Sequence, residues 1–210
     1  MEPLGEHSLL EWVLSRVQRS TRVAQVVLAT SLSAENGVLC ELAERLLVST
    51  TRGSENDVLG RFVQAAGEHG ADHVVRICAD NPFISPEEID RLVCFYLDRM
   101  PDYSFNHIPR MGNEYPDGLG AEIFSYSQLC RLAELTSEPR YREHVTAYFG
   151  DHEKEFRIET FVAPPGIDFP RVKLDVDTRE DLDRLRALVP PISIHSSAFD
   201  VINTYRAVYG

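Results

Sequence analysis

Residues 72–90 read DHVVRICADNPFISPEEID, and they predict a buried strand, a loop and a helix in direct succession. The apolar run 74–78 is typical of a strand in a parallel sheet that is covered on both faces. Pro82 ends this strand, because proline cannot donate a hydrogen bond to a sheet ladder. Ser85 then predicts a helix cap, with a proline at the first helical position and Glu88 three residues after the cap.

Asp80 lies just past the carboxyl end of the predicted strand, where open α/β sheets bind ligands. A carboxylate at this place is a candidate ligand for Mg²⁺, which prefers oxygen ligands and keeps several waters. An aspartate at a strand end also serves as a turn former that accepts bonds from nearby backbone amides. From this stretch alone, both interpretations stay open.

The first half of the chain repeats the same strand and helix unit at short intervals. Before residue 100 the pattern predicts helices over 8–19, 36–45, 57–69 and 86–98 and strands over 25–29, 46–49 and 74–78. This order implies a parallel sheet with right-handed crossovers. After residue 100 the rhythm is looser. The pattern there predicts strands over 103–106, 121–125, 156–162 and 172–176, and helices over 127–135, 142–150, from 178 onward and over 198–207.

Composition limits the class of protein. A chain of 210 residues is long enough for one α/β domain with a full core. The net charge of −12 argues against a nucleic-acid surface, and no apolar run is long enough to span a membrane. Four widely spaced cysteines indicate reduced core residues in a cytoplasmic protein. The only lysines are Lys154 and Lys173, which excludes a phosphate loop of the G-x-x-x-x-G-K-[ST] kind.

Seven blocks of the sequence carry a resemblance to a known family. They are PLGEHSLLEWVLSRVQRS, VVLATS, RGSENDVLGRFVQAA, VVRICADNPFISPEEID, YPDGLGAEIFS, REHVTAYF and LDVDTREDLDRLR. Together they resemble the cytidylyltransferases, which include CMP-KDO synthetase, the acylneuraminate cytidylyltransferases and the spore-coat polysaccharide cytidylyltransferases. The last branch is the most similar. The blocks keep the family's order and spacing and cover nearly the whole chain.

The resemblance implies an α/β fold of three layers, similar to nucleotide-diphospho-sugar transferases and Rossmann-like. Its sheet is mostly parallel and lacks the usual first strand. We expect residues 1–210 to form a single domain, in which 100–160 make the substrate and dimerisation part. The implied reaction is attack by the anomeric hydroxyl of a sugar acid on the α-phosphorus of CTP, giving a CMP-sugar and pyrophosphate. The expected cofactor is Mg²⁺, the partners are CTP and a sugar acid, and the assembly is a homodimer.

The resemblance also implies roles for individual residues. Asp80 and Asp177 would be the magnesium ligands, and Asp177 again follows a predicted strand. Two carboxylates from two strand ends, meeting at one cation, make physical sense. Arg76 would contact a phosphate or carboxylate, although an arginine paired with an acidic neighbour remains an equal alternative. Predicted neighbours of the nucleotide are Ala29, Thr30, Ser31 and Asn81.

The sugar side of the site is predicted from the second half of the chain. Asp117, Gly118 and Glu122 would face the sugar, as would Arg142 and His144. For the last two residues, the alternative is a helix start with acidic and basic faces, and it stays open. Gly120 departs from the family pattern, which commonly has an aspartate there.

A larger departure concerns the opening strand and its phosphate loop, for which the chain shows no counterpart. The segment 1–5 matches the residues that directly follow that loop. We therefore expect Met1 to be an internal methionine of a longer reading frame, or this form to be truncated and impaired. The missing strand would be central, between the predicted strands at 25–29 and 72–78. Their edges must pair with each other, pair with another chain or stay exposed, which predicts low stability or rescue by a dimer.

Two further functions remain as alternatives. One is a nucleotide-sugar glycosyltransferase, because Asp175 and Asp177 form an aspartate-x-aspartate motif. The other is a non-catalytic module that keeps the fold and the dimer surface.

Overall fold

The computed structural model describes residues 2–210, so the prediction about Met1 lies outside the described residues. In chain order the elements are β1 (Pro3–Leu4), β2 (His7–Ser8), α1 (Leu9–Val17), β3 (Val27–Ser31), η1 (Ala34–Asn36), α2 (Gly37–Arg45), β4 (Ser49–Gly53), α3 (Val58–Glu68), β5 (His73–Arg76), α4 (Pro86–Arg99), β6 (Tyr103–Phe105), β7 (Glu122–Ser125), α5 (Tyr126–Leu135), α6 (Pro139–Glu143), α7 (Ala147–Asp151), η2 (Glu153–Glu155), β8 (Ile158–Glu159), α8 (Arg179–Arg186) and α9 (Ala198–Tyr209). No helix in this part of the chain has the length and apolarity needed to cross a membrane.

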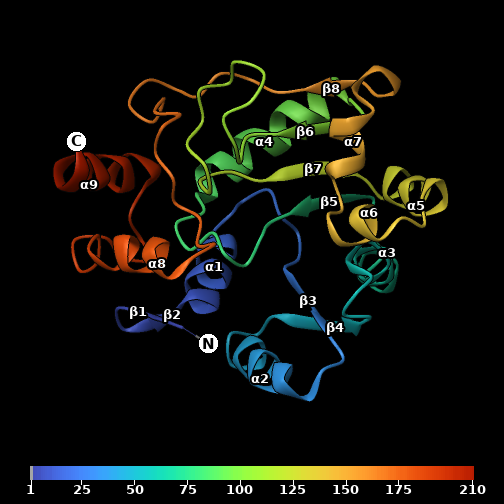
Figure 1. The fold of residues 1–210 in the computed structure, drawn as a ribbon, viewed down its shortest axis with the longest axis horizontal. Helices are drawn as coiled ribbons and strands as arrows, with labels where there is room; N and C mark the ends of the chain where they lie inside the picture. The colour runs from blue at the N-terminus through green and yellow to red at the C-terminus, as the bar shows by residue number, and fades with distance from the viewer. Residues whose placement is uncertain (1) are drawn as a thin grey trace.

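Two separate sheets form the centre of the fold, besides the short β1-β2 hairpin (Figure 1). β3 and β4 pair in parallel, and the second sheet has the order β5-β7-β6-β8. Within the second sheet, β5, β6 and β8 run in one direction, because β7 is antiparallel to both of its neighbours and β6 is parallel to β8. The predicted α/β fold with a mostly parallel sheet is confirmed, and β7 is the one reversed strand of the larger sheet.

The strand β7 shows why the fold has three layers. Ile123 and Phe124 are adjacent along the strand, so their side chains point to opposite faces of the sheet. Ile123 packs in a buried cluster with residues of α1 and α4. Phe124 packs in another cluster, with residues of α3, α5 and α7. The sheet is therefore covered on both faces.

Helix α1 bridges the two sheets. Its start is defined by a capping box between Ser8 and Glu11, as the sequence predicted. Leu10 and Leu14 pack with α2 and the β3-β4 side of the fold. Val13 and Val17 pack with α4 and the underside of the larger sheet. Two neighbouring faces of one helix thus bind two parts of the core.

The two sheets are not joined by backbone hydrogen bonds. β3 pairs only with β4, and β5 pairs only with β7, within residues 2–210. The interruption lies where the sequence predicted the missing central strand. Of the three outcomes expected for these edges, direct pairing with each other does not occur.

Several predicted elements in the second half are shorter in the structure. The helix predicted over 142–150 is divided into α6 and α7, with His144 and Thr146 between them. The strand predicted over 172–176 does not form; this segment makes one isolated bridge, from Lys173 to Asp117. The backbone N–H groups of Leu174 and Val176 donate to the carbonyl oxygens of Asp117 and Asp80, which lie in loops.

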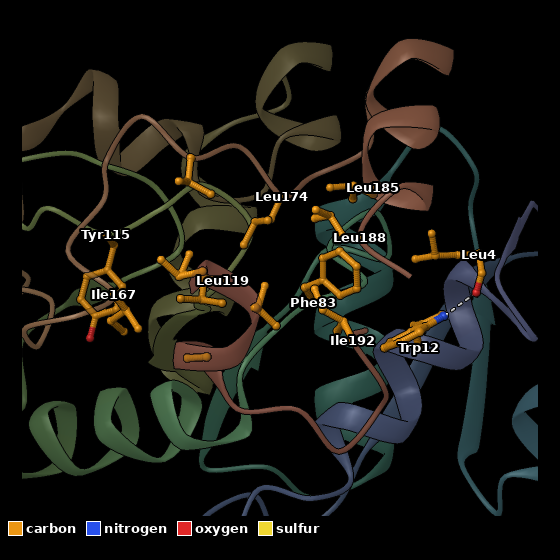
Figure 2. Packing of buried hydrophobic residues seen from close by; sticks show 14 of the residues in the cluster. Leu4, Trp12, Phe83, Tyr115, Leu119, Ile167, Leu174, Leu185, Leu188 and Ile192 are labelled. Atoms are coloured by element: carbon orange, nitrogen blue, oxygen red, sulfur yellow. Dashed lines mark hydrogen bonds between the residues drawn. The ribbon is translucent and has the colours of Figure 1, made fainter. Parts of the chain in front are cut away.

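A second contact of α1 anchors the C-terminal part of the chain. The Trp12 indole packs edge-on against Phe83 and donates to Leu4 O at 2.8 Å (Figure 2). Around them lies a cluster that includes residues of α8 and α9. Arg16 is fully buried and has no carboxylate partner among residues 2–210; it donates to Ile84 O at 2.6 Å and to Ser196 O at 2.9 Å. Burial, and then the charge of Arg19, lower the Arg16 pKa to about 10.

We expect Arg16→Met to lower the free energy of unfolding by about 2–4 kcal/mol, because the buried carbonyl oxygen of Ile84 and the partly buried one of Ser196 would lose their donor. Urea unfolding followed by circular dichroism would measure the change. The control is Arg45→Met, at the exposed last position of α2. Equal stability of both variants would show that the Arg16 contacts contribute no net stability.

Candidate functional site

Three loops that follow strands or run beside them meet at one edge of the larger sheet. Asp80 follows β5, and its carbonyl oxygen accepts a hydrogen bond from Val176 N at 3.0 Å. Asp117 joins the same segment, since its N–H donates to Val172 O at 3.0 Å and its carbonyl accepts from Leu174 N at 2.9 Å. Asp80, Asp117 and the Asp175–Asp177 segment are therefore neighbours, and we call this group of acidic residues the carboxylate edge. Two of these places were predicted independently from strand ends, and the structure brings them together.

Gly118 allows the Asp117 loop to lie close to the Asp175–Asp177 segment. Its φ is +81°, a left-handed conformation that favours glycine. A Cβ at this position would lie 2.7 Å from Asp175 N. Any side chain would push the Asp117 loop away from the Asp175–Asp177 segment. The predicted sugar-facing role of Gly118 is untested, and its visible role is this close packing.

Burial and mutual repulsion make the charged forms of the Asp80, Asp117 and Asp175 carboxylates unfavourable. Asp80 Oδ1 and Asp175 Oδ1 are buried and have no hydrogen-bond partner among the described residues. Burial first, and then the nearby charges of Asp175 and Asp177, raise the pKa of Asp80. Burial and Asp175 likewise raise the pKa of Asp117 to about 6. The group therefore holds negative charge that the protein itself does not fully compensate.

Lys173 supplies part of the compensation. Its Nζ lies 2.9 Å from Asp177 Oδ2 and 3.4 Å from both Asp175 Oδ2 and Asp181 Oδ2. The hydrogen bond to Asp177 raises the Lys173 pKa, although burial acts in the opposite direction. Asp181 is also the third helical residue of α8 and forms a capping box with Thr178. One lysine thus connects the carboxylate edge to the start of α8.

The arrangement fits a divalent cation held by few protein ligands. Among residues 2–210, no group of three or more His, Cys, Asp and Glu side chains is arranged to hold a metal ion. The unpartnered oxygens of Asp80 and Asp175 are nevertheless suitable hard ligands, and Asp177 is exposed beside them. Mg²⁺ typically binds through one or two carboxylates, with waters and substrate phosphates in the other positions. The roles of Asp80 and Asp177 as ligands stay predictions.

The residues predicted near the nucleotide lie in two places, one after a strand of each sheet. Ala29, Thr30 and Ser31 form the carboxyl end of β3. The Ser31 hydroxyl accepts from Asn36 Nδ2 at 2.7 Å, and Arg52 Nε donates to Ser31 O at 3.0 Å. Asn81 is buried in the loop after β5.

A polar pocket lies beside the carboxylates. This basic pocket has a volume of about 420 Å³, and its charged or titratable lining residues include Arg76, His107, Arg110, Glu122, Arg140, His144 and Asp151. Gly118 N donates to His107 O at 2.9 Å, so the pocket and the carboxylate edge share a loop. Two predicted substrate residues, Glu122 and His144, are brought together here with Arg76.

Arg76 and Glu122 form a buried ion pair on neighbouring strands β5 and β7. Tyr103 Oη also donates to Glu122 Oε1, at 2.6 Å. Burial alone would raise the pKa of Glu122, but Arg76 and then His107 lower it to about 2. The alternative that Arg76 is paired with an acidic neighbour is confirmed. Its contact with a substrate stays a prediction, since Arg76 also lines the pocket.

Two nitrogen atoms of residues that line the basic pocket lack partners. Arg76 Nε and His107 Nδ1 are buried and make no hydrogen bond to any described residue. Burial lowers the pKa of His107, which favours its neutral form. Of the other cations, Arg140 pairs with Asp151 at 2.9 Å and Arg110 pairs with Glu153. A ligand with carboxylate or hydroxyl oxygens could satisfy the unpartnered nitrogens.

Arg142 is not brought into the basic pocket. It forms an ion pair with Asp57, and its Nη1 donates to Ala133 O at 3.1 Å. Asp57 in turn caps α3 by accepting from Gly60 N at 2.8 Å. Arg142 lies in the last turn of α6, so it does not stand at the helix start that the alternative expected. Its observed role is the ion pair with the N-cap residue of α3.

Gly120 has a packing reason to differ from the family pattern. A Cβ at Gly120 would lie 2.1 Å from Asn106 O. The Asn106 side chain accepts from Ala121 N at 2.8 Å and donates to Glu88 O at 3.0 Å. This buried asparagine occupies the space next to the glycine, so no side chain fits there without a shift of the β6 end.

Sequence reasoning missed three arginines of the site. Arg52 lies directly opposite Thr30 in the β3-β4 register, and it was within a quoted family block. Arg110 and Arg140 enter the basic pocket from loop and helix positions with no strand-end signal. Only the fold shows that Arg110 and Arg140 line the same pocket as Arg76 and Glu122.

Comparison with known proteins identifies a family. Residues 1–195 match a family model described as cytidylyltransferase. The chain is 29% identical over 193 residues to the spore coat polysaccharide biosynthesis protein SpsF of Bacillus subtilis, a match that covers 90% of this chain and 78% of SpsF. The resemblance inferred from the seven sequence blocks is confirmed.

Solved structures agree with this result. A cytidylyltransferase from Leptospira borgpetersenii superposes with a TM-score of 0.89 at 28% identity, covering 99% of this chain and 86% of that one. CMP:2-keto-3-deoxy-manno-octonic acid synthetase in complex with CTP superposes with a TM-score of 0.63 at 16% identity, covering 89% of this chain and 90% of that one. The second likeness is a likeness of fold.

The raised pKa of Asp117 predicts a pH dependence of stability. The folded state holds the Asp117 proton more tightly than the unfolded state, so stability falls as pH rises from about 4 to 6 and the cost remains above 6. In EDTA, we expect the melting temperature of Asp117→Asn relative to wild type to be higher at pH 7.5 than at pH 4. Asp98→Asn serves as the control, because it makes the same substitution at an exposed position. A pH-independent Asp117→Asn difference would contradict the assignment.

Proposed function

Because the chain belongs to the cytidylyltransferase family, whose members are nucleotidyltransferases, we propose that it transfers CMP from CTP to a sugar acid. The products are a CMP-sugar and pyrophosphate, and the pathway is synthesis of a polysaccharide precursor. The observation that carries this proposal is the contact of the Asp80 loop with the Asp175–Asp177 segment, beside a basic pocket. An enzyme that transfers CMP from a triphosphate to an acidic sugar needs a site for the cation-bound triphosphate and a site for the sugar.

The carboxylate edge supports the triphosphate side of the proposal. Asp80 and Asp177 would hold Mg²⁺, which neutralises phosphate charge when it is bound. The negative field that raises the pKa of Asp80 would be relieved by this cation. The end of β3, with Thr30 and Ser31, supports placing the nucleotide along the same edge.

The basic pocket supports the sugar side. A sugar acid carries a carboxylate and several hydroxyls, and the pocket is lined by Arg76 and His107, whose buried Nε and Nδ1 have no hydrogen-bond partner among the described residues. Arg140 and His144 lie at the same pocket. We assign the carboxylate of the sugar acid to these cationic and neutral donors. Glu122 is held in place by Arg76 and Tyr103, so its role is to orient the donors.

The reaction is balanced without a covalent enzyme intermediate. The anomeric hydroxyl oxygen forms a bond to the α-phosphorus of CTP, and the bond from that phosphorus to the β-bridging oxygen breaks. Pyrophosphate leaves, and the hydroxyl proton is released. The protein contributes mainly orientation of the two substrates and compensation of charge.

Two further expectations belong to this proposal. The free thiols Cys40, Cys78, Cys94 and Cys130 support a reducing compartment, which for a CTP-dependent enzyme is the cytoplasm. The homodimer remains a prediction from the resemblance.

The direct test is a pyrophosphate-release assay with CTP, Mg²⁺ and a panel of sugar acids. We expect pyrophosphate and a CMP-sugar in equal amounts, identified by phosphorus NMR. CTP binding without turnover would favour the non-catalytic module instead. Transfer from a nucleotide sugar to an acceptor would favour the glycosyltransferase.

We predict that Asp80→Asn and Asp177→Asn each lower kcat by at least about 100-fold, because the charge that holds the cation is reduced. Binding of Mn²⁺, followed by electron paramagnetic resonance, should weaken in both variants while circular dichroism is unchanged. Asp183→Asn is the matched control, because this side chain on α8 is 59% exposed and that of Asp177 is 62% exposed. Normal activity in either variant would remove that aspartate from the site.

The basic pocket makes a separate prediction. We expect Arg140→Gln to raise the KM for the sugar acid by roughly 10-fold or more, with little change in the KM for CTP, because a cationic donor to the carboxylate is lost. Arg99→Gln is the control, since its side chain is also mostly exposed and ion-paired, away from the pocket. Equal effects on both KM values would contradict a sugar-acid subsite here.

A further inference from the structure

The short helix α6 contacts both the basic pocket and the helix α3. Arg140 in this helix and its C-cap residue His144 line the basic pocket. Arg142 lies between them in the sequence, and its guanidinium pairs with Asp57, the N-cap residue of α3. Figure 1 shows α6 beside α3. The position of two pocket residues is therefore tied to the start of α3.

The ion pair between α6 and α3 is held on both sides by further bonds. Arg142 Nη1 donates to Ala133 O at 3.1 Å, and Asp57 Oδ1 accepts from Gly60 N at 2.8 Å. A Cβ at Gly60 would lie 3.0 Å from Arg142 Nη2, so glycine at this position leaves room for the pair. Burial raises the pKa of Asp57, but the hydrogen bond from Arg142 outweighs it and the pKa is lowered. The pair is therefore charged at neutral pH and fixed in direction.

Helix α3 in turn holds the segment that follows β4. Arg61 Nη1 donates to Ser54 O at 2.7 Å, and Gln64 Nε2 donates to Arg52 O at 3.4 Å. Both donors belong to the first two turns of α3. A movement of the start of α3 would therefore be passed to Arg52 and the residues after it.

Arg52 carries the connection to the end of β3. Its Nε donates to Ser31 O at 3.0 Å, and its Nη2 donates to Ser33 O at 2.7 Å. In the β3-β4 register, Arg52 lies opposite Thr30. Thr30 and Ser31 are the residues that we place beside the nucleotide. One continuous series of contacts thus runs from the basic pocket through α6, the ion pair and α3 to the nucleotide side.

We propose that Arg142 and Asp57 are positioning residues, which align the sugar acid with the nucleotide by holding α6 against α3. The inference rests on the proposed function, because it concerns the relative placement of the two substrates assigned there. Neither side chain lines the basic pocket, so both act through other residues. A misplacement of about 1 Å can lower the rate of a reaction between bound groups by roughly 100-fold.

A positioning role separates kcat from the KM values and from stability. The sugar acid is assigned to one end of the series of contacts and CTP to the other, so each can bind without the ion pair. Alignment is needed only for the reaction between them, and its loss lowers kcat with little change in either KM. Ion pairs near the surface contribute little to stability, so the melting temperature should hardly change.

The test begins with Asp57→Asn, because asparagine caps a helix as well as aspartate does and only the charge is lost. In the pyrophosphate-release assay with CTP, Mg²⁺ and the sugar acid, we expect kcat to fall at least about tenfold. Both KM values should stay within about twofold of wild type, and the melting temperature within about 3 °C. Arg142→Gln should behave in the same way. An unchanged kcat, or a loss explained by a lower melting temperature, would overturn the proposal.

A double variant shows whether the two residues act as one unit. Asp57→Asn combined with Arg142→Gln should lower kcat no further than either single change, because both changes remove the same contact. Arg142→Lys keeps the positive charge opposite Asp57 and should retain at least about threefold more activity than Arg142→Gln. Losses that multiply in the double variant would show independent roles and overturn the proposal.

An ion pair elsewhere provides the control. Arg99 of α4 pairs with Glu159 of β8 at 3.5 Å, and neither side chain lines the basic pocket. Arg99→Gln and Glu159→Gln should leave kcat unchanged. If wild type releases no pyrophosphate with any sugar acid, the proposed function fails and this inference fails with it. If wild type is active and the Asp57 and Arg142 variants are equally active, this inference alone is overturned.

Discussion

The packing of α1 between the two sheets is the interaction on which the rest of the structure depends. No ladder hydrogen bonds cross from β3 to β5, so side-chain burial has to hold the two parts together. Leu10 and Leu14 of α1 serve one part, and Val13 and Val17 serve the other. Arg16 extends the same helix's contacts to the loop after β5 and to the segment before α9. This amphipathic helix therefore helps to fix how the strand ends are arranged, together with α3, which packs in the core on the other face of the larger sheet.

The site itself is stabilised only partly by the protein. Asp80, Asp117 and the Asp175–Asp177 segment are held close by backbone bonds, which keep negative charges together despite their repulsion. Lys173 offsets some of this charge, and protonation of Asp117 would offset more. The basic pocket has the opposite property, because Arg76 Nε and His107 Nδ1 have no hydrogen-bond partner among the described residues. Such paired imbalances are typical of sites that bind charged ligands, because the ligand completes what the fold leaves unsatisfied.

Local signals predicted most of the helices. Ser8 with Glu11, Ser85 with Pro86, and Thr178 with Asp181 are caps whose chemistry lies within a few residues, and each begins a helix in the structure. Elements that depend on distant partners were less predictable. The strand expected over 172–176 has no partner beyond the bridge at Lys173, and the helix expected over 142–150 is interrupted at His144. The reversed direction of β7 is likewise a property of its neighbours and has no local signature.

The amino-acid sequence by itself determined the α/β class, the family and the position of Asp80 after a strand, because these follow from local periodicity, caps and motif order. Tertiary structure alone decided that Asp117 joins these carboxylates, that Arg110 and Arg140 line a pocket with Arg76, and that Arg142 pairs with Asp57 instead. It also decided that the edges of β3 and β5 remain apart. The physical reason is range: a cap acts within one turn, whereas a cluster of charges or a sheet edge depends on where distant segments pack.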